Sequence, residues 1–562
     1  MDVKERESLS DICERFGDVL ENVQEHVTNQ YVVTVPRDSL PLVVNYAVNE
    51  LGARFVISVA TDMREKTNDY RVSYVLAFDE QKSFVVIQAH VPSDDLRVRS
   101  VTPKVPAANW AEREAQDMIG ITPEGHPDPR RLVLPDDFPN GVHPLRREFE
   151  YNQIFPFEPT NAPPSMNAPE GTTVLPIGPF YPVLEEPAFF KLFMDGERVV
   201  GSDYRGFYNH RAVEKLGDAE LNYNQIPFVA QQICGICGQV HSCGYCQAVE
   251  DACGIDVPIR AKYIRCLLLE LERIHSHLLW VGLAGHIIGF DTVLMQLWRI
   301  REPVMWLMER ITGNRKHYSS NLIGGVRFDI EKDAYEDIRR VIKTVEDELK
   351  AVVDAVVIDT TLLARLKGVG ILTEEDARRL AVVGPVARGS NVAIDARVDH
   401  PYAAYAELGV QKQVQDGCDI WARTLVRVQE LFESIRLVRK CLDDMPEGPV
   451  MADIDESLPY GKTGLCSVEA ARGEAHHYIL SGDENRPYRW RVRAPTYPNH
   501  QAVGVMIHGE NLADVPISIG SYDPCFSCTE RVETLDVSTK EIRIYTREEL
   551  EEISRRKTWG KR

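Results

Sequence analysis

No apolar run in this sequence is long enough to cross a membrane. A spanning helix needs about 20 consecutive, mainly apolar residues, and no stretch of the chain approaches that length. The N-terminal segment MDVKERESLSDICERFGDVL also lacks the apolar core of a signal peptide. We therefore expect a cytoplasmic chain.

Positive charge is scarce as well. The chain carries 64 Lys and Arg against 85 Asp and Glu, a formal net charge of -21. Because proteins that bind nucleic acid usually need a basic face, this balance argues against nucleic acid and leaves protein partners open. The 562 residues, 44% hydrophobic and 27% charged, are typical of a soluble protein with two or more domains.

Disulfides are not expected, because cytosolic thiols stay reduced. The 12 cysteines are then thiols or ligands. Cys243 and Cys246 would share one helix face at i and i+3, and we favour burial over a redox or ligand role. Six isolated cysteines are expected to be small buried apolar side chains: Cys13, Cys253, Cys266, Cys418, Cys441 and Cys466.

Two further cysteine pairs, far apart in the chain, indicate a metal site. Cys234 and Cys237 leave one tight turn, and Cys525 and Cys528 leave another. Folding could gather these four sulfurs around one soft metal. The spacing equally suits zinc, an iron–sulfur cluster or a redox dithiol. Zinc knuckles are usually local, whereas these pairs join distant parts of a large chain, which weakens the zinc interpretation.

The first 148 residues predict a small α+β domain. Segments rich in Val, Ile, Tyr and Phe predict strands at 31–35, 55–60, 70–78 and 84–90, and an apolar periodicity predicts a helix at 40–51. Charged residues at 110–118 and 125–137 form either a solvated loop or a paired docking surface, and composition alone does not decide between them.

The rest of the chain predicts a linker and then helices. Residues 149–175 are rich in proline, which is typical of a linker. Long helices are predicted at 258–285, 334–366 and 402–442. The predicted fold class is therefore an α+β N-terminal domain followed by a mostly α-helical domain, a helical-bundle core with β additions.

The residues around the cysteines resemble a known family. Residues 232–241, Gln-Ile-Cys-Gly-Ile-Cys-Gly-Gln-Val-His, resemble the first cysteine motif of nickel–iron hydrogenase large subunits, and residues 523–531, Asp-Pro-Cys-Phe-Ser-Cys-Thr-Glu-Arg, resemble the second. Segments 176–179, 186–187 and 211–215 resemble the family's opening motifs, and 469–475 resembles its arginine-bearing segment. The chain departs from the family pattern at Gln232, usually Arg, and at Ala212, often Gly.

The N-terminal region narrows the subtype. Segments 110–118 and 125–137 resemble an accessory subunit of respiratory complex I. A chain that fuses this accessory-like region with a hydrogenase-like region is similar to the large subunit of formate-hydrogenlyase-type, energy-converting group 4 hydrogenases. The resemblance implies an accessory-like domain at 1–148, a linker at 149–175 and a catalytic domain at 176–531. An extension at 532–562 would be removed by an endopeptidase that cuts after Arg531, once nickel is inserted.

The resemblance also implies a nickel–iron centre and a ligand set. Cys234 and Cys525 would be terminal nickel ligands, and Cys237 and Cys528 would bridge nickel to an iron that carries carbon monoxide and cyanide. Soft thiolates suit such low-valent metals. The enzyme would interconvert dihydrogen with two protons and two electrons.

Proton transfer and electrostatic roles follow from the same resemblance. Cys525 would accept the proton, and Glu186, or else Glu214, would carry it away; an ordinary salt bridge is the competing interpretation for either glutamate. Arg472 would place a positive charge over the open metal position, although most such arginines are structural ion-pair partners.

Three residues around the centre have proposed supporting roles. His241 would hydrogen-bond a bridging thiolate; a satisfied core histidine is the alternative. Asp514 and Ser518 would contact the diatomic ligands of the iron.

The electrons must pass to another protein, because no cysteine spacing in this chain is typical of a series of iron–sulfur clusters. We expect that an iron–sulfur small subunit docks near the metal site. The resemblance adds ferredoxin-like subunits, membrane-arm subunits, nickel chaperones and a maturation endopeptidase, with formate or ferredoxin as the linked electron carrier. The chain would then lie on the cytoplasmic side of the inner (cell) membrane, held there by its partners, and the N-terminal domain would dock without chemistry of its own.

Two rival functions remain at this point. One is a complex-I-like quinone or NADH dehydrogenase scaffold without the nickel–iron centre. The other is a zinc-stapled interaction protein. The four cysteines together with Arg472 and the Asp-Pro before Cys525 argue against both.

Overall fold

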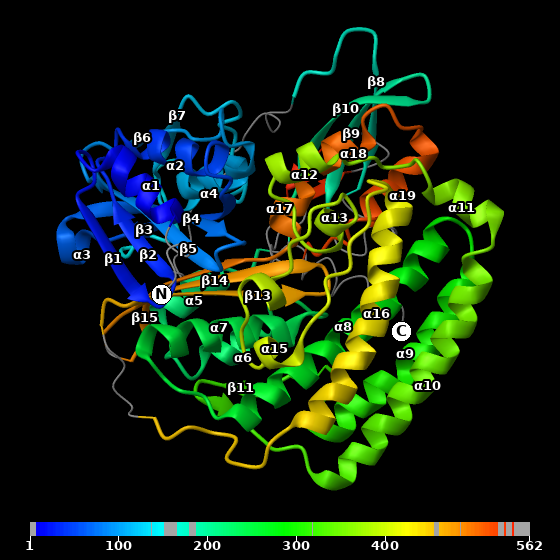
Figure 1. Ribbon diagram of the computed structural model, residues 1–562. Helices are drawn as coiled ribbons and strands as arrows, with labels where there is room; N and C mark the ends of the chain where they lie inside the picture. Colours follow the sequence, from blue (N-terminus) through cyan, green and yellow to red (C-terminus); the bar gives the residue numbers. More distant parts are fainter. Residues whose placement is uncertain are drawn as a thin grey trace, which may run out of the picture.

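The computed structural model describes residues 7–136, 138–150, 166–178, 187–208, 210–316, 318–454, 460–483, 485–526, 533–535 and 542–544. It contains an N-terminal α+β part, two further three-stranded sheets and a group of long helices (Figure 1). No helix among these residues is both long and apolar enough to span a bilayer.

The N-terminal part is built on a five-stranded sheet in the order β1-β2-β5-β4-β3. All neighbours are antiparallel except β2 and β5. The four predicted strands and the predicted helix α2 are confirmed. The elements are α1 (Glu7–Phe16), β1 (Asn22–Val27), β2 (Gln30–Thr34), α2 (Leu40–Asn49), β3 (Arg54–Asp62), α3 (Arg64–Thr67), β4 (Asp69–Phe78), β5 (Ser83–Pro92), β6 (Arg97–Arg99), η2 (Pro106–Ala108), α4 (Asn109–Met118) and β7 (Thr122–Glu124).

The charged segment 110–118 is a buried helix, α4, rather than a solvated loop. Its charged side chains have internal partners: the Asp117 carboxylate accepts three backbone N–H groups from 132–134, and Glu114 pairs with Arg491 at 2.7 Å. Because Arg491 belongs to the second half of the chain, α4 is a paired docking surface between the two halves.

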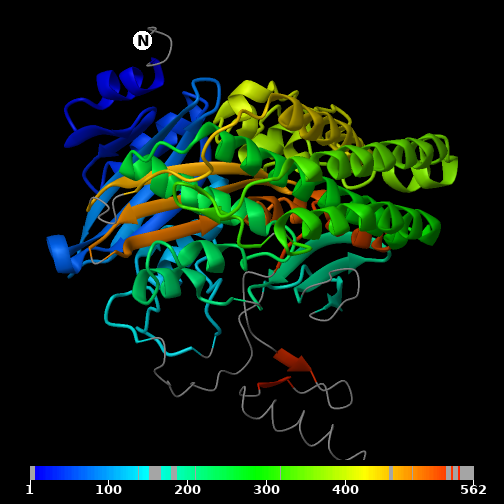
Figure 2. The same ribbon diagram turned by 90° about the horizontal axis from the view of Figure 1, so that it is seen from below.

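The second half contains long helices that pack side by side (Figure 2). α8 is buried along almost its whole length, which its apolar face at 264–278 predicted. The helices are α5 (Val213–Ala219), α6 (Ile226–Ala230), α7 (Gly238–Cys253), α8 (Ile259–Ile287), α9 (Asp291–Thr312), α10 (Lys332–Val356), α11 (Thr360–Leu366), α12 (Glu374–Arg379), α13 (Pro385–Arg388), α14 (Ala396–Asp399), α15 (Tyr405–Leu408), α16 (Ile420–Asp444), α17 (Thr496–His500), α18 (Val503–Ile507), η4 (Leu512–Asp514) and α19 (Val515–Gly520).

Strands are more prominent in this half than the expected "mostly helical" class implies. Antiparallel sheets form from β8, β9 and β10 and from β13, β14 and β15. Every residue of β13 and β14 is buried, because this sheet lies between the N-terminal part and α7 (Figure 1). The strands are β8 (Thr173–Ile177), β9 (Phe189–Asp195), β10 (Arg198–Arg205), β11 (Asn321–Leu322), β12 (Gly325–Val326), β13 (Thr463–Ala470), β14 (Gly473–Ser481), β15 (Pro487–Arg493), β16 (Glu533–Leu535) and β17 (Ile542–Ile544).

Two predicted long helices are interrupted. The 334–366 helix ends at Val356, and a new helix begins after Asp359, whose side chain accepts two backbone N–H groups as an N-cap. The 402–442 helix is wrong before residue 420, because Cys418 has a left-handed φ of 56° and Asp419 caps α16. Of the predicted linker, 151–165 lies outside the described residues, 166–172 has no helix or strand, and 173–175 belongs to β8.

Candidate metal centre

The fold brings Cys525, the described member of the second cysteine pair, to the first pair. Cys234 lies in the turn before α7, Cys237 is the N-cap of that helix, and Cys525 follows α19. The sulfurs of Cys234 and Cys525 are 3.3 Å apart although 291 residues separate them. The Cys234 sulfur also accepts the backbone N–H groups of Ile236 and Cys237, each at 3.4 Å. All three cysteines are buried.

Arg472 reaches this cluster from the turn between β13 and β14. Its Nη1 is 3.7 Å from the Cys234 sulfur, and its Nε is 2.8 Å from Asp523 Oδ1. Burial alone would lower the pKa of Arg472, but Asp523 and the cysteines raise it well above its ordinary value. The guanidinium therefore remains a fixed positive charge beside the thiols.

The turn that carries Arg472 is held by close backbone packing. The Asn499 side chain accepts the N–H of Val383 at 2.8 Å and donates to the carbonyls of Val383 and Arg472. Gly384 packs against the turn so closely that a Cβ there would lie 2.3 Å from the Gly473 Cα. Loop 383–384 thus fixes the direction in which Arg472 leaves the sheet.

The thiols resist ionisation in the absence of a cation. The hydrogen bond with Cys237 is the largest cause that raises the pKa of Cys234, and burial adds to it. In Cys237 the hydrogen bond to Cys234 lowers the pKa, but burial together with the negative charges of Cys525 and Glu272 outweighs it, and the pKa is raised. Metal binding would displace the thiol protons, so metal affinity should rise with pH.

His241 lies in α7, one turn after Cys237, and is fully buried. Its Nδ1 is 3.3 Å from His477 Nε2, and its Nε2 has no hydrogen-bond partner among the described residues. Burial, assisted by Arg211, lowers the pKa of His241 to about 4. The ring is therefore neutral at physiological pH.

Glu214, in α5, is paired with two arginines, as the competing salt-bridge interpretation anticipated. Its carboxylate lies 2.8 Å from Arg489 and 2.8 Å from Arg491. Burial raises the pKa of Glu214, but the two guanidinium groups outweigh it and bring the pKa to about 2. An anion of this kind is a weak proton acceptor at neutral pH.

A cavity connects Glu214 with Cys525. It has about 840 Å³ of empty volume, part of it open to solvent, and its walls include Trp110 and Glu114 of α4, Glu214 and Cys525. The cavity therefore lies where the N-terminal part meets the second half of the chain.

The two residues expected near the iron ligands have other neighbours. Asp514 forms an ion pair with Arg365 at 2.8 Å. The buried Ser518 hydroxyl, on α19, has no hydrogen-bond partner among the described residues and lies near Gly370 and Arg423. Cys528, Glu186 and Arg531 lie outside the described residues, and of the extension 532–562 only the backbone of β16 and β17 is described.

The other cysteine predictions hold in part: burial is confirmed for Cys243, Cys246 and three of the six isolated cysteines and is wrong for the other three. The eleven described cysteines are free thiols. Cys243 and Cys246 are fully buried on α7, and burial raises the pKa of Cys243 to about 12. Of the six isolated cysteines, Cys266, Cys441 and Cys466 are buried, and Cys13, Cys253 and Cys418 are partly exposed.

Several residues at the site were not predicted from the sequence. Thr496 Oγ1 accepts the Cys525 N–H at 3.0 Å, and Asp523 anchors Arg472. Glu272 of α8 accepts the N–H groups of residues 239 and 240 at the start of α7, and burial raises the pKa of Glu272 to about 8. Thr496 and Glu272 lie at no distinctive spacing from a cysteine, whereas Asp523 stood within a quoted motif, but its pairing with Arg472 was not predicted.

The residues present fit a soft metal. Two thiolates that each lie about 2.3 Å from one metal ion are roughly 3.3 to 3.8 Å apart, and the Cys234–Cys525 sulfur distance falls at the start of that range. The unpaired Nε2 of His241 and the Arg472 guanidinium offer donors to an anionic group. Among the described residues no group of three His, Cys, Asp or Glu side chains could hold a metal ion, so the described residues do not complete a site by themselves.

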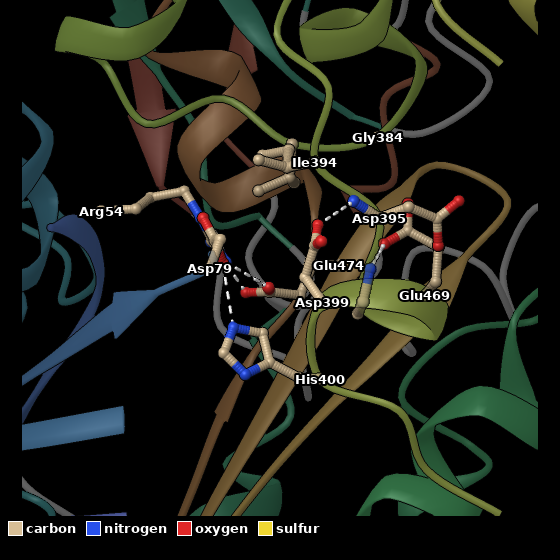
Figure 3. Close-up of a pocket in the computed structure, with 11 residues that line it drawn as sticks. Arg54, Asp79, Gly384, Ile394, Asp395, Asp399, His400, Glu469 and Glu474 are labelled. Atoms are coloured by element: carbon tan, nitrogen blue, oxygen red, sulfur yellow. Dashed lines mark hydrogen bonds and ion pairs between the residues drawn. The ribbon is translucent and has the colours of Figure 1, made fainter. Parts of the chain in front are cut away.

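A second pocket, too narrow to admit a water molecule, lies beside the Arg472 turn, at the seam between the two halves (Figure 3). Figure 3 shows His400 directed at Asp79, 2.9 Å from Nε2 to Oδ1. Arg54 of β3 binds both Asp79 and Glu474, at 2.8 and 2.7 Å. Burial raises the pKa of Glu469, another lining residue, to about 7. These groups form an ionic seam that joins the N-terminal sheet to β13 and β14.

Comparisons with protein families match three models to this chain. Residues 33–154 match the respiratory-chain NADH dehydrogenase 30 Kd subunit. Residues 220–284 match the nickel-dependent hydrogenases. Residues 288–467 and 456–531 match the respiratory-chain NADH dehydrogenase 49 Kd subunit.

Individual relatives cover nearly the whole chain. Formate hydrogenlyase subunit 5 of Escherichia coli is 39% identical over 97% of this chain and 97% of its own length, and hydrogenase-4 component G of the same organism is 39% identical over 97% and 96%. An NADH-quinone oxidoreductase subunit of Aquifex aeolicus is 30% identical over 87% and 93%. Among solved structures, a chain of the archaeal membrane-bound sulfane sulfur reductase matches with a TM-score of 0.61 and 30% identity, covering 65% of this chain and 100% of its own.

Proposed function

Because the chain belongs to the nickel–iron hydrogenase large subunits of the membrane-bound, formate-hydrogenlyase type, with a complex-I-like N-terminal domain, we propose that four cysteines hold its catalytic centre. They are Cys234, Cys237, Cys525 and Cys528. The observation that carries this proposal is the 3.3 Å approach of the Cys234 and Cys525 sulfurs beneath the Arg472 guanidinium. When bound, a nickel–iron centre supplies heterolytic cleavage of dihydrogen; carbon monoxide and cyanide on the iron are part of the proposal.

The side chains around the thiols have electrostatic and proton-transfer roles in this proposal. Arg472, oriented by Asp523, keeps a positive charge beside the thiols in a site from which water is largely excluded, where a fixed charge has its largest effect. Cys525 accepts the proton at its sulfur, while its backbone N–H is fixed by Thr496. The ion pairs with Arg489 and Arg491 keep the Glu214 carboxylate ionised and make it a weak proton acceptor. Glu186 therefore remains the first candidate to carry that proton away.

The electrons then leave through partner proteins. We propose an iron–sulfur small subunit at the metal site, with ferredoxin-like and membrane-arm subunits beyond it. The names of the relatives support this, since they include a membrane-bound hydrogenase subunit of Pyrococcus furiosus, 39% identical over 68% of this chain and 93% of its own length. The chain itself would lie at the membrane surface, bound through those partners. Maturation would involve nickel chaperones and an endopeptidase that cuts after Arg531.

The scaffold alternative, a complex-I-like subunit without the metal centre, has weaker support. It requires that the cysteines serve no ligand role, yet the described thiols converge on one point. The relatives named as NADH-quinone oxidoreductase subunits also share less identity with this chain, 30% against 39%.

Metal content and infrared spectra test the proposed function. Protein purified anaerobically from its native host, in the form shortened to Arg531, should contain one nickel per chain and show carbon monoxide and cyanide stretches. Stoichiometric zinc, or no metal, in that shortened form would contradict the proposal. Protein that still carries the extension is measured in parallel, because metal-free protein of that form would mean only that maturation had failed.

A further inference from the structure

The buried ring of His241 stands at one end of a chain of hydrogen bonds that begins at Trp490. The indole Nε1–H of Trp490, on β15, donates to His477 Nδ1 at 3.2 Å. His477, on β14, faces His241 with 3.3 Å between its Nε2 and His241 Nδ1. All three side chains are at most 1% exposed, so no bulk water competes for these bonds.

The donor and acceptor chemistry fixes every proton in this chain. An indole nitrogen can only donate, so His477 Nδ1 must accept and carry no proton. A neutral imidazole then holds its proton at Nε2, which donates to His241 Nδ1. By the same rule His241 carries its proton at Nε2. Geometry alone thus makes both rings neutral and assigns one tautomer to each.

The His241 Nε2–H is therefore a donor, and it has no acceptor among the described residues. An unpaired buried donor is destabilising, so such a group is expected to gain a partner in the functional state. His241 lies one helical turn after Cys237. In the proposed function this cysteine is a thiolate, which supplies acceptor chemistry at the start of α7.

The packing around His477 is specific to this arrangement. Gly244 of α7 lies against the ring, and a Cβ at that position would be 2.8 Å from His477 Cδ2. Trp490 is held in turn by Tyr245, whose ring packs edge-on against the indole at 5.4 Å and 70°. The absence of a side chain at Gly244 lets β14 bring His477 within reach of His241.

We propose that His477 and Trp490 are positioning residues that hold His241 in its Nε2–H tautomer and direct this N–H at a thiolate sulfur of the metal centre. The choice of thiolate acceptor rests on the proposed function, whereas the Trp490–His477–His241 chain does not. A partner that sets the tautomer of a histidine near a metal typically affects metal affinity or activity by about 10- to 100-fold.

Substitutions at His477 separate positioning from packing. In H477Q the side-chain carbonyl can accept the indole N–H and the amide can donate to His241, so the chain is preserved. H477L fills similar space but can neither accept the indole N–H nor donate to His241. W490F removes only the indole N–H donor at the start of the chain. Y245F removes the hydroxyl that donates to the Tyr223 carbonyl at 3.2 Å and leaves the chain intact, which makes it the matched control.

The first readout needs no metal. In metal-free full-length protein labelled with ¹⁵N-tryptophan, W490F identifies the Trp490 indole resonance. That resonance should move in H477L and remain close to its wild-type position in H477Q and Y245F. An indole resonance that is unmoved in H477L would show that the hydrogen bond to His477 does not exist and would overturn the proposal.

The second readout uses protein loaded with metal in its native host. The carbon monoxide and cyanide stretches should shift in H477L and W490F, stay near wild type in H477Q and Y245F, and be accompanied by a 10- to 100-fold loss of hydrogen turnover in H477L. Unshifted bands in both H477L and W490F, or a shift in H477Q as large as in H477L, would overturn the proposal. Wild-type protein without such bands would instead contradict the proposed function, while the indole measurement would still test the chain.

Discussion

At the scale of single residues, Cys525 has the most consequential position. Its sulfur is 3.3 Å from that of Cys234. C525A should lose nickel and reduce hydrogen turnover to background, because one of four thiolates is removed and the proposed proton acceptor with it. C246A, a buried cysteine outside the cluster, should retain both and lose only about 1 kcal/mol of stability. Near-wild-type turnover in C525A would refute the ligand assignment.

Ala212, which departs from the family pattern, shows backbone strain at the scale of one residue. It is the N-cap of α5 with φ 50° and ψ 34°, a left-handed conformation that costs a residue with a Cβ roughly 1–2 kcal/mol. The family often has glycine there. A212G should therefore raise the free energy of unfolding by roughly 0.5–1 kcal/mol after the entropic cost of glycine.

Denaturant unfolding measures this effect, with A502G as the comparison. Ala502, the N-cap of α18, has a right-handed φ of -82°, so glycine should destabilise that position. Equal destabilisation by both substitutions would show that Ala212 is not strained.

At the scale of elements, the turn between β13 and β14 determines where Arg472 points. Gly384 presses on this turn with φ 68° and ψ -147°, a conformation that only glycine adopts readily. In G384A the new Cβ would meet the backbone of Gly473 and Arg472 at 2.3 to 2.7 Å. We expect a loss of more than about 2 kcal/mol in stability and a larger proportional loss of hydrogen turnover, as the guanidinium moves.

Gly409 supplies the control for this substitution. It also has a positive φ, 60°, but open space around it. G409A should cost about 1–2 kcal/mol through strain alone and leave turnover per folded molecule unchanged. If both variants keep full turnover, the close approach at Gly384 does not position Arg472.

At the scale of the whole molecule, the ionic seam joins the two halves and should make stability depend on pH. Burial raises the pKa of Glu474, but Arg54 and Arg493 outweigh it and bring the pKa to about 2, against about 4.3 when unfolded. A lowered pKa contributes stability that is fully present above the unfolded value and is lost as pH falls through the folded value. The contribution is roughly 3 kcal/mol, lost between about pH 4.5 and 2.

The E474Q variant tests this seam. It should be less stable than the wild type at pH 7, and the difference should shrink as pH falls toward 2 in urea unfolding experiments. E375Q, a change at an exposed position of α12, should follow the wild-type pH dependence. A difference between E474Q and wild type that stays constant from pH 7 to 2 would contradict the assignment.

Local patterns in the sequence determined most elements and part of the site. Enrichment in Val, Ile, Tyr and Phe predicted four strands of the N-terminal sheet, because these side chains suit a buried sheet, and a 3.6-residue periodicity predicted α8, because it marks the helix face that packs on a core. The cysteine spacing likewise predicted a soft-metal site. The interruptions of the two long helices were not predicted, because the side-chain caps at Asp359 and Asp419 start new helices within stretches whose apolar periodicity continues.

Only the tertiary structure decided which residues act together. The approach of Cys234 to Cys525, the Asp523 anchor of Arg472, the arginine pairs of Glu214 and the Trp490–His477–His241 chain all join residues distant in sequence. Their partners are chosen by burial: a charge or polar group removed from water must find a complement nearby in space. Local sequence determines the type of each element, but the packing of all of them determines where that complement lies.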